Sequence, residues 1–223
     1  MAKSPLDRQI QFRFKGALVS AWGHNFDHIH DNVLGLRIAR TAFQEYISNA
    51  LNRLPQFLKR IAKFLMPAYF LPARVVMKTL KPGWQEEFDN ETAMYERLRP
   101  LQGHRIPEFL GHATHEGSPA ILLSHIEGVP SYKQDPSCPM AAEQFEKLVE
   151  EALWELTKYG VAYGDTKLDN FLISDGKVKI VDLEVVFEVE PPDYELAVTS
   201  HLDHLLGQYR LYLNGCFADF GPS

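Results

Sequence analysis

The chain has very little cysteine and no long run of uncharged apolar residues. Its two cysteines, Cys138 and Cys216, are too few for a disulfide framework or a four-cysteine zinc site, so we expect reduced thiols. The first eight residues (MAKSPLDR) hold no apolar core of a signal peptide. The most apolar stretch, residues 57–71, is interrupted by three basic residues and a proline, and so falls short of a membrane-spanning helix. These absences predict a cytoplasmic protein without a transmembrane segment.

Positive charge is also scarce. The chain has 29 acidic residues against 23 lysines and arginines, which gives a net charge of −6 at pH 7. A dedicated nucleic-acid-binding protein needs a basic surface, so no nucleic-acid partner is expected. With 223 residues, of which 45% are hydrophobic, the chain can bury a core as one domain.

Upstream of residue 78 the sequence lacks a Gly-x-Gly-x-x-Gly segment between two strands. The alternation from Ile10 to Lys15 predicts an early strand. Gly35 to Met66 is instead predicted to be helical, because apolar residues recur every three or four positions, and Pro55 is expected to kink or split it. Residues 53–66 are basic. A basic amphipathic helix can lie on a membrane surface, but we favour a helix packed on its own domain with a solvated basic face.

The rest of the chain is predicted to mix strands and helices. A β-branched run and a helix come first, followed by a meander of strands after Pro107. Two amphipathic helices then flank a hairpin whose Asp-Gly turn favours tight strand pairing. The expected ranges are 72–80 (strand), 84–98 (helix), 143–159 (helix), 170–174 with 178–181 (hairpin) and 195–213 (helix).

The strongest chemical signal lies in the segment YGDTKLDNFLI, residues 163–173, and in the hairpin that follows it. This segment contains Asp165, Lys167 and Asn170, and the hairpin ends in Asp182. A carboxylate can orient a hydroxyl nucleophile, and amide and carboxylate oxygens are hard ligands suited to Mg²⁺. The plainer interpretation is that the aspartates only cap a turn and close the hairpin.

The pattern Gly-Asp-x-Lys-x-x-Asn-Phe-Leu-Ile, followed by a β-run that ends in Asp, resembles the catalytic and metal-binding segments of the protein-kinase-like superfamily. The resemblance covers about Arg74 to Leu213 and is to compact atypical kinases of the fungal type. It implies an α+β, two-lobe protein-kinase-like fold in a single domain, residues 1–223. The N-lobe, to about residue 127, would be degenerate because it has no Gly-rich loop, and the C-lobe, from about 128, would be truncated.

The resemblance also implies roles for single residues. Asp165 corresponds to the catalytic base, and Lys167 to the cation that neutralises the transferring phosphoryl group. Asn170 and Asp182 correspond to the ligands of Mg²⁺ on ATP.

Four further residues are implied as nucleotide-binding. Lys78 matches the strand lysine that grips the α- and β-phosphates, and Glu91 matches the helix glutamate that holds it. His125 and Glu127 lie in a segment that resembles the adenine-binding hinge. Taken without the downstream motif, Lys78 and Glu91 could equally be a solvated surface pair.

Two functions stay open. The first is an atypical ATP- and Mg²⁺-dependent phosphotransferase acting on a protein Ser/Thr or a small-molecule hydroxyl. The second is a pseudokinase, a binding or regulatory module, which the missing Gly-rich loop and the short C-lobe favour. The motif departs from the family pattern at Tyr163, where His is usual, and at Glu184, which replaces the Gly of Asp-Phe-Gly. We favour the first function, because none of the matched catalytic residues is lost.

Overall fold

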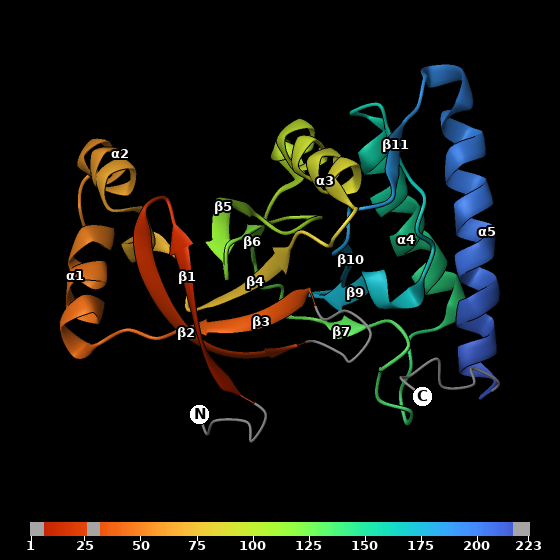
Figure 1. The fold of residues 1–223 in the computed structure, drawn as a ribbon. Helices are drawn as coiled ribbons and strands as arrows, with labels where there is room; N and C mark the ends of the chain where they lie inside the picture. The colour runs from red at the N-terminus through yellow and green to blue at the C-terminus, as the bar shows by residue number, and fades with distance from the viewer. Residues whose placement is uncertain (1–6, 26–31, 216–223) are drawn as a thin grey trace. The chain divides into compact units, whose positions relative to one another are not determined.

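The computed structural model describes residues 7–25 and 32–215. The chain divides into two compact units, which Figure 1 shows as ribbons. The first unit comprises residues 1–83 and 109–125, and the second comprises residues 84–108 and 126–223. The described helices and strands therefore give a mixed α+β protein, as expected.

The first unit is built on a closed antiparallel barrel with the strand order β1-β2-β3-β4-β6-β5. The strands are β1 (Arg8–Phe14), β2 (Ala17–Asn25), β3 (Val33–Ile38), β4 (Arg74–Thr79), β5 (Phe109–His115) and β6 (Ser118–Ser124). The barrel closes where Phe14 of β1 pairs with Ala113 of β5. Alternate side chains point inward and fill the barrel, as strand geometry requires. The buried set includes Ile10, Phe12, Phe14, Val19, Ala21, Leu34, Leu36, Val75, Met77, Ala113, Ala120 and Leu122.

This barrel corrects the expected fold. The two-lobe protein-kinase-like fold, with a degenerate N-lobe and a truncated C-lobe, is wrong, because the described strands before residue 125 close into a six-stranded antiparallel barrel. The error has a physical source. Leu34 and Leu36 alternate along β3, but Leu36 and the later apolar residues also have helical spacing. The predicted helix from Gly35 therefore includes residues that form a strand. The pairing of β1 with β5 joins segments far apart in the sequence, which local patterns do not reveal.

Two helices and a 3₁₀ turn connect β3 to β4 in the first unit (Figure 1). They are α1 (Ala42–Asn52), α2 (Gln56–Leu65) and η1 (Pro67–Phe70), so the helical run is split at Pro55 as predicted. A capping box starts α1, since Thr41 Oγ1 accepts from the Gln44 backbone N–H and Gln44 Oε1 accepts from the Thr41 N–H. The structure describes all of α2, and none of its residues is buried. Helix α2 does contact η1 and α1 of its own unit, but this packing does not bury its apolar side.

The second unit consists mainly of helices with two small sheets among its described residues. The sheets have the strand orders β10-β9-β7 and β11-β8. Phe145 of α4 stacks on Tyr209 of α5, with ring centroids 4.0 Å apart, so the two long helices share a core. The elements are α3 (Gln85–Arg97), η2 (Arg99–Leu101), β7 (Val129–Pro130), α4 (Ala142–Thr157), β8 (Val161–Tyr163), η3 (Leu168–Asn170), β9 (Phe171–Ser174), β10 (Lys177–Ile180), β11 (Val186–Glu188), η4 (Pro191–Asp193) and α5 (Tyr194–Leu213).

No helix within residues 7–25 and 32–215 is both long and apolar enough to cross a lipid bilayer.

A buried arginine ties the second unit together. The Arg105 side chain is 4% exposed, and its Nε and Nη2 donate to the two carboxylate oxygens of Glu155 at 2.7 and 2.9 Å. Nη2 also donates to Glu151 at 3.1 Å, while the Arg105 carbonyl accepts from the Ile180 N–H at 2.8 Å. The hydrogen bond from Arg105 lowers the pKa of Glu155, against the opposing effect of partial burial. This bidentate pair therefore joins the segment after η2 to α4 and β10.

Replacing Glu155 by Gln should destabilise the protein in a pH-dependent way. At pH 7 we expect the free energy of unfolding to fall by about 1.5–3 kcal/mol, the range for hydrogen bonds to charged groups. The folded-state pKa of Glu155 lies below its ordinary value of 4.5, so its charge stabilises the wild type above that pH. This contribution is lost as the pH falls through the folded-state pKa, and the gap between wild type and variant should shrink. Urea unfolding followed by circular dichroism measures both effects, with exposed Glu150→Gln on the same helix as the control. A gap that does not change with pH would contradict the assignment.

Candidate functional site

Two backbone segments approach each other closely at Gly164, which directly follows β8. The Gly164 N–H donates to the Val185 carbonyl at 2.9 Å, and Tyr163 pairs with Val186 of β11. A Cβ on Gly164 would lie 3.1 Å from Val185 Cγ1 and 3.2 Å from its carbonyl oxygen, so a larger residue would require the neighbouring segment to shift by a few tenths of an ångström. Glycine at this position therefore holds the loop that begins at Asp165 against the segment before β11.

Three of the predicted site residues meet in this loop. Asp165 Oδ2 accepts hydrogen bonds from Asn170 Nδ2 at 3.0 Å and from Lys167 Nζ at 3.1 Å. The 3₁₀ turn η3 sets this spacing, since the Asn170 N–H donates to the Lys167 carbonyl. The Asp165 side chain is 19% exposed and that of Lys167 is 64% exposed. The carboxylate is thus held in place, while the ammonium group remains accessible to solvent.

Asp182 reaches the same region from the next segment of the chain. The Val181 N–H donates to the Asn170 carbonyl at 3.1 Å, which places the end of the hairpin beside η3. Asp182 Oδ1 accepts from the Glu184 N–H at 2.9 Å and so closes a tight turn. Asp182 therefore has the turn-closing contact of the plainer interpretation and also lies next to Asn170.

The acidic groups shift the pKa values of their neighbours. Partial burial alone would lower the pKa of Lys167, but its hydrogen bond to Asp165 and the charges of Asp165, Asp169 and Asp182 raise it overall. Burial raises the pKa of Tyr163 well above its usual value, and the charges of Asp182 and Asp165 add to that rise. The side chains of Tyr163 and Lys167 therefore lie in a region of concentrated negative charge. Such a region favours the binding of cations.

Two residues that the sequence analysis did not predict form hydrogen bonds with the backbone of this loop. Gln208 of α5 donates to the Thr166 carbonyl at 2.9 Å. Buried Ser131 donates its hydroxyl to the Leu168 carbonyl at 2.8 Å and its N–H to the Phe171 carbonyl at 3.0 Å. Both bind backbone atoms of a distant segment, so their positions in the sequence carry no recognisable pattern.

The four predicted nucleotide-binding residues are divided between the units. Lys78 on β4 and His125 belong to the first unit, whereas Glu91 on α3 and Glu127 belong to the second. Lys78 is 5% exposed and follows Met77, whose side chain fills the barrel, so strand alternation turns Lys78 to the outer face of β4. Glu91 is 1% exposed, and His125 Nε2 lies 3.0 Å from Arg74 Nη2. Glu127 contributes its carbonyl, which accepts from the Ser174 hydroxyl.

The donor set of the second unit suits a nucleotide-bound Mg²⁺ better than a metal held by protein alone. In the part of the chain that the structure describes, no group of three or more His, Cys, Asp or Glu side chains could hold a metal ion. Mg²⁺ commonly uses only one or two protein ligands together with phosphate oxygens and water. Asn170 directs its amide nitrogen to Asp165, which leaves its amide oxygen as the ligand atom. Asn170 and Asp182 thus fit Mg²⁺ as partial ligands.

Two surface hollows of about 710 and 480 Å³ lie in the first unit, and none of the predicted site residues lines either of them. Residues of β1, β2 and β5 line the larger one, and the smaller one lies between β2, the start of α1 and η1. Both are wide open to solvent, so neither is a better candidate for chemistry than the loop around Asp165.

No protein-family model matches the chain, and a search of curated proteins found no match. The geometry of the loop around Asp165 is therefore the basis for assigning a function.

Replacing Asp165 by Asn should lower the pKa of Lys167. The substitution removes the nearest negative charge but keeps the shape of the side chain, so partial burial is no longer fully offset. NMR titration of the lysine Nζ and Cε signals measures the change, with Lys177 in the β9–β10 hairpin as the internal control. An unchanged pKa of Lys167 would show that the Asp165–Lys167 contact is absent in solution.

Proposed function

We propose that this protein transfers the γ-phosphoryl group of ATP to a hydroxyl acceptor, either a protein Ser/Thr or a small molecule. The observation that carries the proposal is the arrangement around the Asp165 carboxylate, which is bonded by Lys167 and Asn170 and lies beside the Asp182 turn. One loop and the turn next to it thus offer a base, a mobile cation and two hard-oxygen ligands. Phosphoryl transfer of the protein-kinase type uses such a combination of groups.

Each residue has a distinct part in the proposed reaction. Both hydrogen bonds to Asp165 fall on Oδ2, so Oδ1 is the oxygen that would accept the proton of the acceptor hydroxyl. The hydroxyl oxygen forms a bond to the γ-phosphorus, and the bond from that phosphorus to the bridging oxygen breaks and releases ADP. Lys167, with its exposed side chain, can turn from Asp165 to the equatorial phosphoryl oxygens. Mg²⁺ bound by Asn170 and Asp182 would neutralise charge on the β- and γ-phosphates.

A cytoplasmic site of action also remains a proposal. It is supported by the free, exposed thiol of Cys138, since free surface thiols suit a reducing compartment. Cys216 lies outside the described residues.

Substituting Asp165 by Asn should abolish most of the turnover of ATP. Loss of a positioned general base typically slows the reaction about 10²- to 10⁴-fold. The measurement is ADP release with Mg²⁺ in the presence of protein and small-molecule hydroxyl acceptors. Asp175→Asn is the matched control, because Asp175 has φ 52° in the β9–β10 turn and Asn tolerates positive φ. Background rates in the wild type and in both variants would refute phosphoryl transfer to the acceptors tested.

A second candidate function is a nucleotide-binding module that does not transfer phosphate. The observation in its favour is the β1–β2 connection, a two-residue turn at Lys15 and Gly16 with φ 47° and 85°. Such a turn suits a tight hairpin and supplies no row of backbone N–H groups for phosphates. Without that support, alignment of the γ-phosphate would be weaker.

Nucleotide binding without turnover would distinguish the two functions. At 100 times its dissociation constant, ATP with Mg²⁺ should stabilise the wild type by about 2.7 kcal/mol, measured as a thermal shift. The shift should shrink when EDTA removes Mg²⁺ and in Asp182→Asn, which loses a charged ligand but can still accept from the Glu184 N–H. Stabilisation together with background turnover would support the binding module. Indifference of the melting temperature to ATP would reject both functions.

A further inference from the structure

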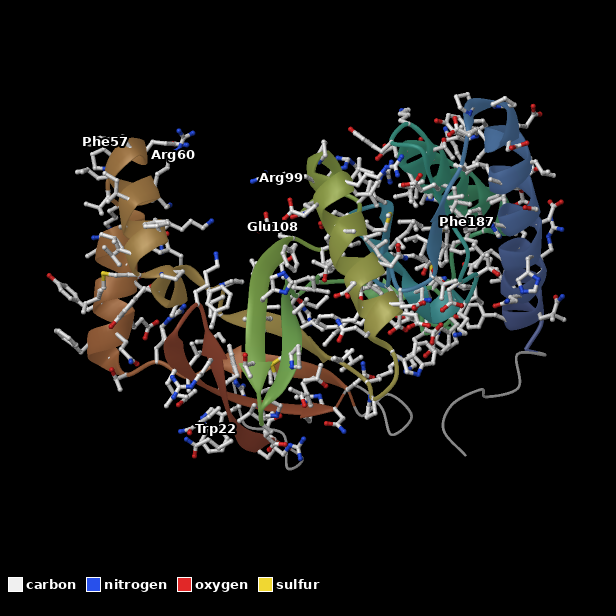
Figure 2. All side chains as sticks on the ribbon, turned by 45° about the horizontal axis from the view of Figure 1, so that its top comes forward. Trp22, Phe57, Arg60, Arg99, Glu108 and Phe187 are labelled. Carbon is white, nitrogen blue, oxygen red and sulfur yellow. The ribbon has the colours of Figure 1, made fainter. Side chains whose placement is uncertain are left out.

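Helix α2 separates apolar and basic residues onto opposite sides. At about 100° per residue, the aromatic and aliphatic residues of the segment QFLKRIAKFL fall on one side and the basic ones on the other. The apolar side holds Phe57, Leu58, Ile61, Phe64 and Leu65, and the basic side holds Lys59, Arg60 and Lys63. Figure 2 shows Phe57 and Arg60 leaving the helix in different directions. A helix with this pattern in a globular protein normally buries its apolar side.

This helix does the opposite. Phe57 is 66% exposed, Phe64 is 84% exposed and Leu65 is 68% exposed. Helix α1, which contacts α2, also exposes two aromatic residues, Phe43 at 70% and Tyr46 at 71%. Exposed apolar residues scattered singly are ordinary, but a group of aromatic and aliphatic side chains on adjoining helices marks an interaction surface.

The charge around this surface has one dominant sign. Between Ala42 and Met66 the chain has four basic residues, and its single acidic residue is Glu45 on α1, whereas α2 itself has none. This local excess of positive charge stands in a chain whose net charge is −6. The surface therefore complements a partner that is apolar inside and negatively charged outside, which describes a bilayer with anionic lipids.

Helix α1 is anchored to the segment that follows α2. Buried Ser48 of α1 donates its hydroxyl to the Tyr69 carbonyl in η1 at 2.6 Å. Arg40, just before α1, donates to the Leu71 carbonyl just after η1, which closes the base of the insertion. These contacts fix the chain on both sides of α2, and the apolar residues of α2 remain exposed.

We infer that α2, together with Phe43 and Tyr46 of α1, docks on the surface of a membrane that contains anionic lipids. The ten residues of α2 span about 15 Å, so the helix lies in the interface with its apolar side among the acyl chains. Lys59, Arg60 and Lys63 reach the headgroup phosphates, while their aliphatic stems cover apolar surface. A second copy is a poorer occupant, because pairing of α2 with α2 about a twofold axis brings the same basic residues together. Membrane docking is independent of phosphoryl transfer.

Sedimentation of the full chain with lipid vesicles tests the inference. The protein should pellet with vesicles of phosphatidylcholine and phosphatidylserine, less with phosphatidylcholine alone, and less again at high salt. Each basic residue near an anionic surface contributes about fivefold to binding, so Lys59→Gln with Lys63→Gln should weaken it about 25-fold. Phe57→Ser with Phe64→Ser should abolish pelleting. Because these side chains are exposed, the variants should keep the wild-type circular dichroism spectrum.

The control is Leu196→Ser on α5, since Leu196 is 69% exposed and lies outside the first unit. It should pellet like the wild type. Absence of pelleting with anionic vesicles would overturn the inference, as would equal losses in the control and in the Phe57–Phe64 variant. Sedimentation velocity measures whether the protein forms a dimer through this surface. A dimer that the Phe57–Phe64 substitutions dissociate, without vesicle binding, would assign the surface to a second copy and reject the membrane.

Discussion

The close approach of backbones at Gly164 is the constraint on which the candidate site depends. Its N–H donates to the Val185 carbonyl, and a side chain at this position would be in tight contact with Val185. The contact extends the pairing of β8 with β11, and the loop that follows β8 must then turn back over the end of the hairpin. Asp165 and Asp182 become neighbours through this constraint, although they come from separate segments. Gln208 then fixes the loop from α5 by binding its backbone. Main-chain hydrogen bonds thus bring the segments of the site together. The acidic side chains of these segments then concentrate negative charge there.

Local patterns predicted much of the second unit. The hairpin on either side of Asp175 and Gly176 was expected and is present as β9 and β10, because an Asp-Gly turn and alternating apolar residues are signals contained within a few positions. The helices α4 and α5 were also expected, with bounds within two residues of those observed. The proximity of Asp165, Lys167 and Asn170 follows from their spacing within one short loop. Their catalytic roles remain predictions, because spacing shows which groups can meet and does not show which reaction they perform.

The barrel could not be predicted in this way. Its closure depends on Phe14 pairing with Ala113, and nothing in either segment alone specifies that partner. Gly23 of β2 pairs with Leu36 of β3, and a Cβ on Gly23 would collide with the neighbouring Gly35 carbonyl. Glycine at position 23 is therefore explained by contact between two strands, which is a long-range property. The likeness of one short segment to a large family suggested a whole fold, and the inference failed because a short motif constrains only the segments that build it.

Helices α2 and α4 show why periodicity alone does not distinguish a core helix from a docking helix. Both carry an apolar stripe, yet Phe145 and Val149 of α4 are fully buried, while Phe64 of α2 is 84% exposed. The difference that the sequence does contain is the sign of the charge opposite the stripe. The polar side of α4 is predominantly acidic, and that of α2 is entirely basic apart from Gln56. An apolar stripe needs an apolar partner in either case. Basic residues opposite the stripe favour a partner with a negative surface. The sign of the charge, and not the periodicity, therefore distinguishes the docking helix from the core helix.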